Sequence, residues 1–220
     1  MNKEPKITLV GAGPGDPELL TLKGARALRT ADVILYDALI DTRLLNHARP
    51  EAPRIFVGKR AGAHRMSQEE INALLVKSAK AHGHAVRLKG GDAFVFGRGK
   101  EETAYAQEQG IPVEIVPGIS SCIALPELQQ VPPTSRGYSE SFWVITGTTR
   151  SGGLSGDIAL AAQSTATVIV LMGMRKATAI AQEFIKQGKA DLPAMVISKG
   201  STADERRVLG TAATLPALIE

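Results

Sequence analysis

Short runs of β-branched and other apolar residues alternate with longer stretches of helical periodicity through the first half of the chain. Each run is a few residues long and ends at a turn signal, which is typical of a buried strand. Strands are predicted at residues 6–10, 32–36, 54–57, 85–89 and 113–116. Because the predicted strands alternate with helix-like stretches, the pattern predicts a mostly parallel α/β sheet.

The clearest helix signal starts at Ser67. Ser67 and Glu70 have the spacing of a capping box, in which the serine side chain accepts a hydrogen bond from the Glu70 amide and the glutamate side chain reaches back. Apolar residues follow at helical spacing, at Ile71, Leu74 and Leu75. The sequence therefore predicts a helix over about 68–81.

The second half repeats the alternation with a different pairing at its end. Strands are predicted at residues 142–146, 167–172, 194–198 and 206–210, and a helix over about 176–187. The segment between the last two strands is too short for a crossover helix, so these strands are expected to be antiparallel and the second sheet mixed. A proline-rich stretch over 111–133 contains the predicted hinge. We therefore expect two α/β domains, residues 1–115 and 116–220.

Composition and charge narrow the class of protein. The chain has 220 residues, 44% of them hydrophobic, and a formal net charge of +4, which excludes a disordered or disulfide-scaffold protein. The single cysteine, Cys122, requires no oxidising compartment, and the first apolar run ends at Gly11, too early for a signal peptide or membrane span. We expect a cytoplasmic protein without a membrane partner. The mild basic excess suits either nucleic acid or a small polyanion.

A glycine-rich turn, VGAGPGDP over residues 10–17, follows the first predicted strand. A dinucleotide fingerprint would have glycine where this chain has Asp16, so the pattern argues against NAD. The turn still lies at the carboxyl end of a strand, where open α/β sheets bind ligands, and its glycines and prolines favour a rigid backbone surface. A plain tight turn is the alternative interpretation.

A second glycine turn follows the fourth predicted strand, in RLKGGDAFVFGRG over residues 87–99. It lacks the spacing of a Walker phosphate loop. Two adjacent glycines followed by an acid suit a ligand that lies against bare backbone and presents a cation or hydroxyl groups to a carboxylate. Phe94 and Phe96 are expected to pack in the core.

Charged residues follow the second and third predicted strands, at Asp37 and Lys59. The carboxyl ends of adjacent parallel strands meet at one edge of a sheet, so both side chains are expected near the glycine turns. An acid and an amine there could exchange protons with a substrate. A surface salt bridge is the alternative.

The histidines and the cysteine give little indication of a metal site or a reactive thiol. The histidines are His47, His64, His82 and His84, and none has the spacing of a metal-binding helix, so no metal is expected. His82 and His84 flank Gly83 at the end of a predicted helix and are expected to be exposed. Cys122 is expected to be a small buried side chain. Met172 closes a predicted strand, where it either packs in the core or faces a purine.

Taken in order, these motifs resemble those of the tetrapyrrole methylase family. The segments that carry the resemblance, from about residue 7 to residue 215, are GAGPGDPELLTLKG, YDALI, VGKRAG, RLKGGDAFVFGRG, VPGISS, RGYSESF with TG, and MGM. The resemblance implies two α/β domains with a ligand cleft between them, S-adenosyl-L-methionine as methyl donor, and a homodimer. It also implies methylation of uroporphyrinogen III at C2 and then C7, giving precorrin-2, the branch point toward siroheme and cobalamin.

The resemblance assigns site residues as well. Asp37 would be the proton acceptor and Lys59 the proton donor. The residues that would line the methyl-donor site are Pro14, Gly90, Gly91, Asp92, Val95, Ser120, Ser121, Met172 and Gly200. The donor carries no phosphate, so exposed backbone groups and a carboxylate suit it better than a Walker lysine.

The implied substrate is a macrocycle bearing many carboxylates, so its pocket should be lined by cations. Besides Lys59, the candidates are Arg43, Arg60, Arg98 and Arg136. Three positions depart from the family pattern, since Ala93 stands where proline is usual, and Ser135 and Thr148 stand where histidine is usual. Ala93 removes a fixed φ from the donor loop, and the other two remove imidazoles from the substrate side.

Two alternatives stay open on the sequence. The same fold could act on a later precorrin or on ribosomal RNA, but the chain lacks interleaved aromatic residues for stacking on bases, and no nucleic-acid partner is expected. The chain could instead be a non-catalytic module that binds S-adenosylmethionine. Retention of both Asp37 and Lys59 argues against such a module.

Overall fold

The computed structural model describes residues 4–58 and 66–219. The chain divides into two compact units, Met1–Ser121 and Cys122–Glu220, and each is described by itself. The predicted domain boundary, between residues 115 and 116, lies at the end of a strand, β5 (Val113–Val116), a few residues before this division.

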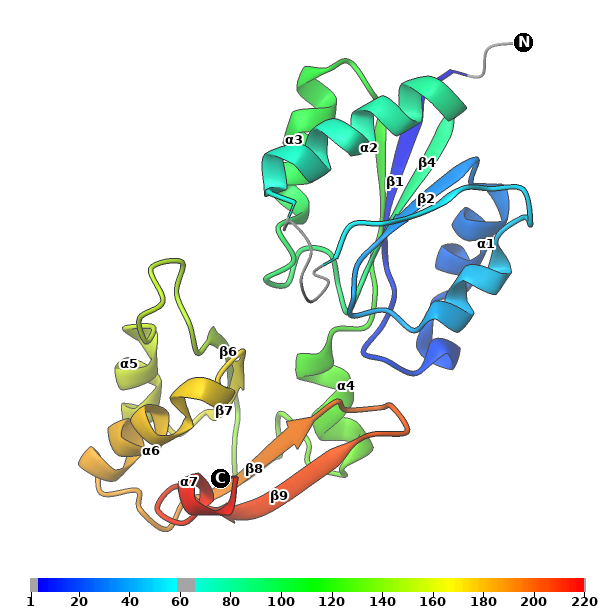
Figure 1. The fold of residues 1–220 in the computed structure, drawn as a ribbon. Coiled ribbons are helices and arrows are strands. Elements are labelled where there is room, and N and C mark those ends of the chain that lie inside the picture. Colours follow the sequence, from blue (N-terminus) through cyan, green and yellow to red (C-terminus); the bar gives the residue numbers. More distant parts are fainter. Residues whose placement is uncertain (1–3, 59–65, 220) are drawn as a thin grey trace. The chain divides into compact units, whose positions relative to one another are not determined.

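The first unit contains a five-stranded sheet in the order β3-β2-β4-β1-β5 (Figure 1). Besides β5, its strands are β1 (Lys6–Gly11), β2 (Val33–Tyr36), β3 (Arg54–Phe56) and β4 (His84–Lys89). All four pairings are parallel, which confirms the predicted parallel sheet. The carboxyl ends of all five strands therefore lie at one edge.

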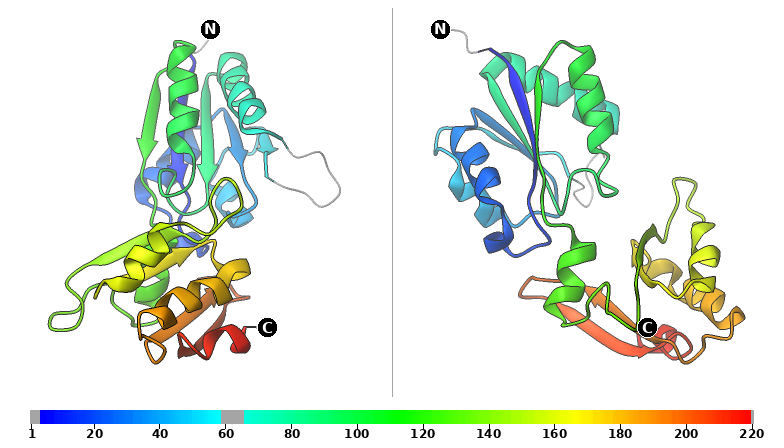
Figure 2. Two further views of the ribbon diagram at one scale, coloured as in Figure 1. Left: turned by 90° about the vertical axis from the view of Figure 1, so that its left-hand side faces the viewer. Right: turned by 180° about the vertical axis from the view of Figure 1, so that it is seen from behind.

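Helices cover both faces of this sheet (Figures 1 and 2). One face carries α1 (Leu22–Thr30) and the 3-10 segment η2 (Thr42–His47), and the other carries α2 (Gln68–His82) and α3 (Gly99–Glu108). A further 3-10 turn, η1 (Pro17–Leu19), precedes α1.

Strand alternation decides which side chains meet which helix. Ile7 and Leu9 of β1 pack in a buried cluster with Leu75 of α2, whereas Val10 packs in a second cluster with Leu28 of α1. Because neighbouring residues of a strand point to opposite faces, both faces of β1 are apolar and the sheet is buried between two helical layers.

The predicted capping box begins α2. Ser67 Oγ accepts a hydrogen bond from Glu70 N at 3.2 Å, and Glu70 Oε2 accepts one from Ser67 N at 2.6 Å. These bonds satisfy amide groups that the first turn of a helix leaves without partners. The predicted helix is thus confirmed, one residue longer than expected.

The second unit contains two small sheets. Strand β6 (Phe142–Thr146) pairs in parallel with β7 (Thr167–Leu171), and β8 (Pro193–Ser198) pairs antiparallel with β9 (Arg206–Thr211). The predicted antiparallel pairing is confirmed. The two pairs do not share one mixed sheet, however, and each forms a sheet of its own. A short connection between two strands predicts that those two strands pair. It does not predict whether one strand pair hydrogen-bonds to another pair to form a single sheet.

The remaining helices belong mainly to the second unit. They are α4 (Ser121–Leu128), α5 (Asp157–Gln163), the 3-10 turn η3 (Met174–Lys176), α6 (Ala177–Lys186) and α7 (Leu215–Leu218). Ile145 of β6, Ile158 of α5 and Ile180 of α6 pack in one apolar cluster. Cys122 is buried, as expected. No helix among the described residues has the length and hydropathy needed to span a bilayer.

His84 corrects an expectation, because it is buried at the start of β4 rather than exposed. Its Nδ1 lies 3.0 Å from the Thr30 carbonyl oxygen, to which it donates, and its Nε2 lies 2.8 Å from Thr8 Oγ1. The sequence places His84 beside a helix end, but the strand starts immediately after Gly83 and carries the imidazole into the sheet.

Candidate functional site

Three turns at the carboxyl edge of the five-stranded sheet are bonded to one another. The turns after β1 and β4 exchange two hydrogen bonds, from Gly13 N to Gly91 O at 3.2 Å and from Gly91 N to Gly13 O at 2.7 Å. The turn after β5 joins them through Gly118, whose amide donates to Asp92 Oδ2 at 3.0 Å. The two predicted glycine turns and the segment after β5 therefore form one backbone surface, here called the glycine platform.

Close packing explains the glycines of this platform. A Cβ on Gly11 would lie 2.5 Å from Gly118 Cα, and a Cβ on Gly118 would lie 2.4 Å from Gly91 O. Gly91 differs, because its φ is +64° and a Cβ there would meet nothing within 4 Å. Gly91 therefore presents bare backbone to open space, as a ligand lying against the main chain would need.

The Asp92 carboxylate holds the platform together. Its Oδ1 accepts a hydrogen bond from Phe94 N at 2.8 Å, and its Oδ2 accepts the bond from Gly118 already described. Two charge-assisted bonds to backbone amides fix both the local turn and the neighbouring one. Direct binding of a ligand by Asp92 stays a prediction.

The segment after Asp92 overturns the expectation for its phenylalanines. Phe94 and Phe96 are each 45% exposed, and Val95 beside them is exposed as well. The backbone explains this, since Phe96 and Arg98 both have positive φ, at +51° and +59°, and the chain turns rather than continuing as a strand. The alternation of a strand does not apply to such a turn, so the rings project from the surface.

Asp37 lies on the same edge, directly after β2. Its Oδ1 accepts a hydrogen bond from Leu39 N at 3.0 Å. The turn that contains Leu39 packs on the glycine platform, because a Cβ on Gly90 would lie 2.5 Å from Leu39 Cβ. Lys59 and Arg60 lie outside the described residues, so the predicted pairing of Asp37 with Lys59 stays a prediction.

A buried charged cluster lies beneath Asp37. Arg87 and Lys89 of β4 both contact Glu102 of α3, with Arg87 Nε and Lys89 Nζ at 3.2 Å and 3.0 Å from Glu102 Oε1. Gln68 Nε2 donates to the same oxygen at 3.2 Å. Arg87, Lys89 and Glu102 are all buried, whereas the Asp37 side chain is 20% exposed and lies 3.5 Å from Arg87 NH2.

Burial shapes the electrostatics of this cluster. Desolvation, followed by the charge of Arg87, lowers the pKa of Lys89, and the Glu102 and Asp37 carboxylates act in the opposite direction. Glu102 Oε2 is buried and has no hydrogen-bond partner among the described residues. The sequence reasoning passed over these residues, although two basic residues at alternate positions of a central strand are an unusual signal for buried charge.

Three of the candidate substrate-binding arginines, Arg43, Arg98 and Arg136, lie among the described residues and are exposed, and two of these carry local partners. Arg43 NH2 lies 2.7 Å from Asp41 Oδ2, and Arg98 NH2 lies 2.6 Å from Glu101 Oε2. The hydrogen bond from Arg43 lowers the pKa of Asp41. Arg136 is exposed in the segment before β6. Each guanidinium is therefore accessible to an anion from solvent.

Two predicted donor residues belong to the second unit. Met172 follows β7, is 57% exposed and has a φ of +58°, and its carbonyl accepts a hydrogen bond from Thr148 Oγ1 at 3.1 Å. Gly200 is buried, and a Cβ there would lie 2.5 Å from the Leu125 methyl carbons. Met172 is therefore a surface side chain rather than a core one, and Gly200 has a packing reason to be glycine. Ser120 and Ser121 lie at the end of the first unit, both half-buried.

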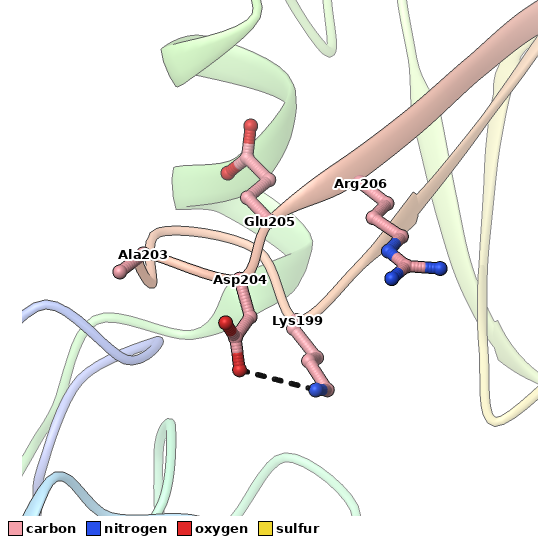
Figure 3. Close-up of a pocket in the computed structure, with 5 residues that line it drawn as sticks. All are labelled: Lys199, Ala203, Asp204, Glu205 and Arg206. Carbon is pink, nitrogen blue, oxygen red and sulfur yellow. Dashed lines mark hydrogen bonds and ion pairs between the residues drawn. The ribbon is translucent and has the colours of Figure 1, made fainter.

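A surface pocket of about 300 Å³ lies beside Gly200, at the turn between β8 and β9 (Figure 3). It is lined by Lys199, Ala203, Asp204, Glu205 and Arg206. Lys199 Nζ and Asp204 Oδ2 point toward one another, 3.2 Å apart. The pocket contains none of the predicted site residues. Among the described residues, no three His, Cys, Asp or Glu side chains are grouped so that they could hold a metal ion.

The parallel α/β fold and the glycine turns at its carboxyl edge agree with the motifs of the tetrapyrrole (corrin/porphyrin) methylases. The model of this family matches residues 6–216, and the chain belongs to the family. The family and the α/β fold class expected from the motifs are thus confirmed.

Comparison with individual proteins gives more specific similarities than the family model does. Uroporphyrinogen-III C-methyltransferase of Methanocaldococcus jannaschii is 44% identical, over 94% of this chain and 86% of that protein. Siroheme synthase 1 of Yersinia enterocolitica is 45% identical over 97% of this chain, which spans only 45% of that longer relative. Among solved structures, uroporphyrin-III C-methyltransferase from Thermus thermophilus, complexed with S-adenyl homocysteine, is 40% identical, with a TM-score of 0.83 and coverage of 98% of this chain and 87% of that one.

Proposed function

We propose that this chain is a methyltransferase that moves methyl groups from S-adenosyl-L-methionine to uroporphyrinogen III, at C2 and then at C7, giving precorrin-2. The observation that carries the proposal is the glycine platform beside Asp37, in a chain 40% identical to an enzyme complexed with S-adenyl homocysteine. The relative from Methanocaldococcus jannaschii, which carries the same named activity, matches over nearly the whole chain and supports it further.

The residues of the platform suit a sulfonium nucleoside. Such a donor has a ribose, an adenine and an amino-acid tail, which need backbone hydrogen bonds and apolar surface rather than a phosphate loop. In the first unit Gly91 offers open backbone and the exposed Val95 offers apolar surface; in the second unit the exposed Met172 offers apolar surface. In the proposal the donor is held by Pro14, Gly90, Gly91, Asp92, Val95, Ser120, Ser121, Met172 and Gly200. When bound, it supplies an electrophilic methyl group.

The protein's own contribution is positioning and proton handling. Holding two reactants in line contributes roughly 7 to 11 kcal/mol, and one proton-transfer residue contributes about 10²- to 10⁴-fold in rate. The pyrrole carbon forms the new bond to the methyl group as S-adenosylhomocysteine leaves, and Asp37 accepts the proton that the macrocycle then loses from a neighbouring position. The place of Asp37 beside the platform brings it within reach of a substrate there. Lys59 is the proposed proton donor.

The substrate's carboxylates are proposed to bind Arg43, Arg60, Arg98 and Arg136. Arg43 and Arg98 already hold carboxylates of this chain, Asp41 and Glu101, through two of their nitrogens each. A guanidinium presents five N–H donors in a planar fork, so each can bind a second carboxylate without losing the first.

Two further parts of the proposal concern the assembly and its place in the cell. We expect the protein to act as a homodimer, which small-angle scattering and analytical ultracentrifugation of the purified protein will measure. We expect it to work in the cytoplasm, where its single cysteine needs no oxidising environment.

The experiment that tests the activity is an anaerobic incubation of the purified protein with uroporphyrinogen III and S-adenosylmethionine, followed by mass analysis of the product. Two added methyl groups are expected. A parallel incubation with ribosomal RNA is expected to leave the RNA unmethylated. Methylated RNA with an unchanged macrocycle would overturn the proposed substrate, and no methyl transfer to either would favour a donor-binding module.

Asp37→Asn tests the proposed proton acceptor. The amide keeps the shape of the side chain but cannot accept a proton, so kcat should fall by about 10²- to 10⁴-fold. The hydrogen bonds that hold the platform together join Gly13, Gly91, Gly118 and Asp92, and Asp37 takes part in none of them. The affinity for S-adenosylhomocysteine, measured by calorimetry, should therefore stay within about twofold of wild type. An unchanged kcat would remove Asp37 from the mechanism.

A further inference from the structure

Arg87 has each of its three guanidinium nitrogens directed at a different acceptor. Nε donates to Glu102 Oε1 at 3.2 Å, NH1 donates to the Leu88 carbonyl oxygen at 2.8 Å, and NH2 faces Asp37 Oδ2 at 3.5 Å. The first two acceptors are buried and fixed by α3 and by the backbone of β4. With Nε and NH1 held, the planar fork leaves NH2 only one direction, which is toward Asp37.

Among the described residues, the charges of the cluster balance only when Asp37 is counted. Arg87 and Lys89 are two cations, and Glu102 is the single buried carboxylate that contacts both. One positive charge is left over, and Asp37 is the anion nearest to it. Removing charges from water is unfavourable unless they are paired, so Asp37 supplies the carboxylate that the second cation of the cluster would otherwise lack.

Asp37 has a second contact, through the other oxygen of its carboxylate, and this contact also fixes the orientation of the side chain. Leu39 N donates to Oδ1 while Arg87 faces Oδ2. The carboxylate is thus held between a backbone amide of its own turn and a cation of the neighbouring strand. A proton acceptor needs such fixed geometry, since proton transfer requires hydrogen-bond reach to the reacting atom.

We propose that Arg87, anchored by Glu102, is a positioning residue that orients the Asp37 carboxylate and keeps it ready to accept a proton. The inference rests on the proposed role of Asp37. Arg87 itself touches neither reactant in this scheme and acts only through Asp37. The same residues could instead form a purely structural buried ion cluster, and the two roles predict different measurements.

A double-mutant cycle on kcat separates the two roles. Arg87→Gln leaves Lys89 paired with Glu102, so no buried cation is left without a carboxylate and the variant is expected to fold. We expect kcat to fall about tenfold in the wild-type background, a part of the loss seen when a proton acceptor is removed. In the Asp37→Asn background, Arg87→Gln should have almost no further effect, because the group it positions is gone.

Arg49→Gln is the matched control. Arg49 also forms an arginine–aspartate pair and a backbone bond, with Asp32 Oδ1 and the Ala31 carbonyl oxygen, but at the opposite end of β2. Its loss should lower the melting temperature and leave kcat unchanged.

Arg87→Lys keeps the positive charge but lacks the planar guanidinium with its several N–H donors. We expect it to restore less than half of the kcat that Arg87→Gln loses.

A readout independent of activity is the Leu39 amide signal in the ¹⁵N spectrum of the free protein. Arg87→Gln should shift this signal, since its acceptor is the Asp37 carboxylate, whereas Arg49→Gln should not. KM for uroporphyrinogen III and the affinity for S-adenosylhomocysteine should stay within about twofold in both variants.

The outcomes distinguish this inference from the proposed function. If Asp37→Asn keeps wild-type kcat, the proposed role of Asp37 fails. If Asp37→Asn lowers kcat but the fold-losses in kcat of the two single variants multiply in the double variant, Asp37 keeps its role and Arg87 is a structural residue only. The same conclusion follows if Arg87→Gln leaves the Leu39 amide signal unshifted. Should Arg87→Gln not fold, the cycle is run with Arg87→Lys, and multiplication of effects there overturns the inference equally.

Discussion

The glycines of the platform do two different things. Gly11 and Gly118 lie against other backbone atoms at 2.5 Å or less for a notional Cβ, so they let three turns approach one another. Gly91 has an open outer side and a positive φ, so it exposes main chain to a ligand. Substitution at the first kind should act on folding, and substitution at the second kind should act on binding.

Gly91→Ala is therefore expected to weaken donor binding more than it destabilises the protein. The left-handed φ costs a non-glycine residue about 1 to 2 kcal/mol, and no neighbouring atom adds a clash. The new methyl group stands where the donor is proposed to lie, so the Kd for S-adenosylhomocysteine should rise at least about tenfold, which calorimetry measures.

Gly110→Ala is the control for Gly91→Ala. Gly110 also has a positive φ, +74°, and also has nothing within 4 Å of a notional Cβ, but it follows α3 at the other end of the sheet. Its melting temperature should fall by a similar amount while its Kd stays that of wild type. Equal affinities in the two variants would place the donor away from Gly91.

For individual residues, the sequence motifs predicted where a residue lies in the fold better than whether its side chain is buried or exposed. The sequence located Asp37, Gly90 and Gly91 at one edge, because strand ends of a parallel sheet coincide there. It mistook the exposed Phe94 and Phe96 for core, since their alternation imitates a strand and only the left-handed backbone at Phe96 reveals the turn. Glu102 carries no local signal, because its partners come from β4 through tertiary packing.

Among the secondary-structure elements, β4 contributes both to the apolar core and to the buried charged cluster. Val86 and Leu88 face the apolar cluster under α1, whereas Arg87 and Lys89 face Glu102 of α3. The strand begins at the buried His84, which bonds to Thr30 and Thr8. One central strand thus carries a titratable group at each end, a neutral imidazole at the start and the charged cluster near the platform.

His84 gives the first unit a defined response to acid. Burial is the largest cause that lowers its pKa, helped by Lys6 and opposed by the Thr30 carbonyl, Asp32 and Glu114. The unfolded chain therefore binds a proton where the folded protein does not, and the free energy of unfolding should fall as the pH drops below about 6.5. Above that pH, His84 contributes no pH dependence.

Urea unfolding at about pH 7.5 and about pH 5.5 measures this effect. His84→Gln retains an amide that can bond to Thr30 or Thr8 and cannot titrate, so the drop in unfolding free energy between the two pH values should be smaller in the variant. The two proteins differ only at residue 84, so the comparison isolates the effect of the His84 side chain. Equal drops would mean that His84 titrates normally in the fold.

For the whole molecule, the residues proposed to hold the donor come from two separate stretches of the chain. Pro14, Gly91 and Asp92 belong to the first, and Met172 and Gly200 to the second. Hydrogen exchange of the full chain, with and without S-adenosylhomocysteine, tests this division. Amides near Gly91 and amides near Met172 and Gly200 should both exchange more slowly with the ligand, and slowing confined to the first unit would remove Met172 and Gly200 from the proposed set.

At this scale the sequence predicted the order of strands along the chain but not their full assembly. Alternating runs predicted nine strands, and all nine are present within a residue or two of their expected bounds. The separation of β6–β7 from β8–β9 was not predictable, because apolar runs record burial and not the identity of the neighbouring strand.

The mutual hydrogen bonds between Gly13 and Gly91, and those of Asp92, have a thermodynamic consequence. Main chain that is already tied to two neighbouring turns has little conformational entropy left to lose when a ligand settles on it. The immobilisation of these loops is completed when the first unit folds, so a nucleoside bound there as proposed would meet main chain that is already ordered.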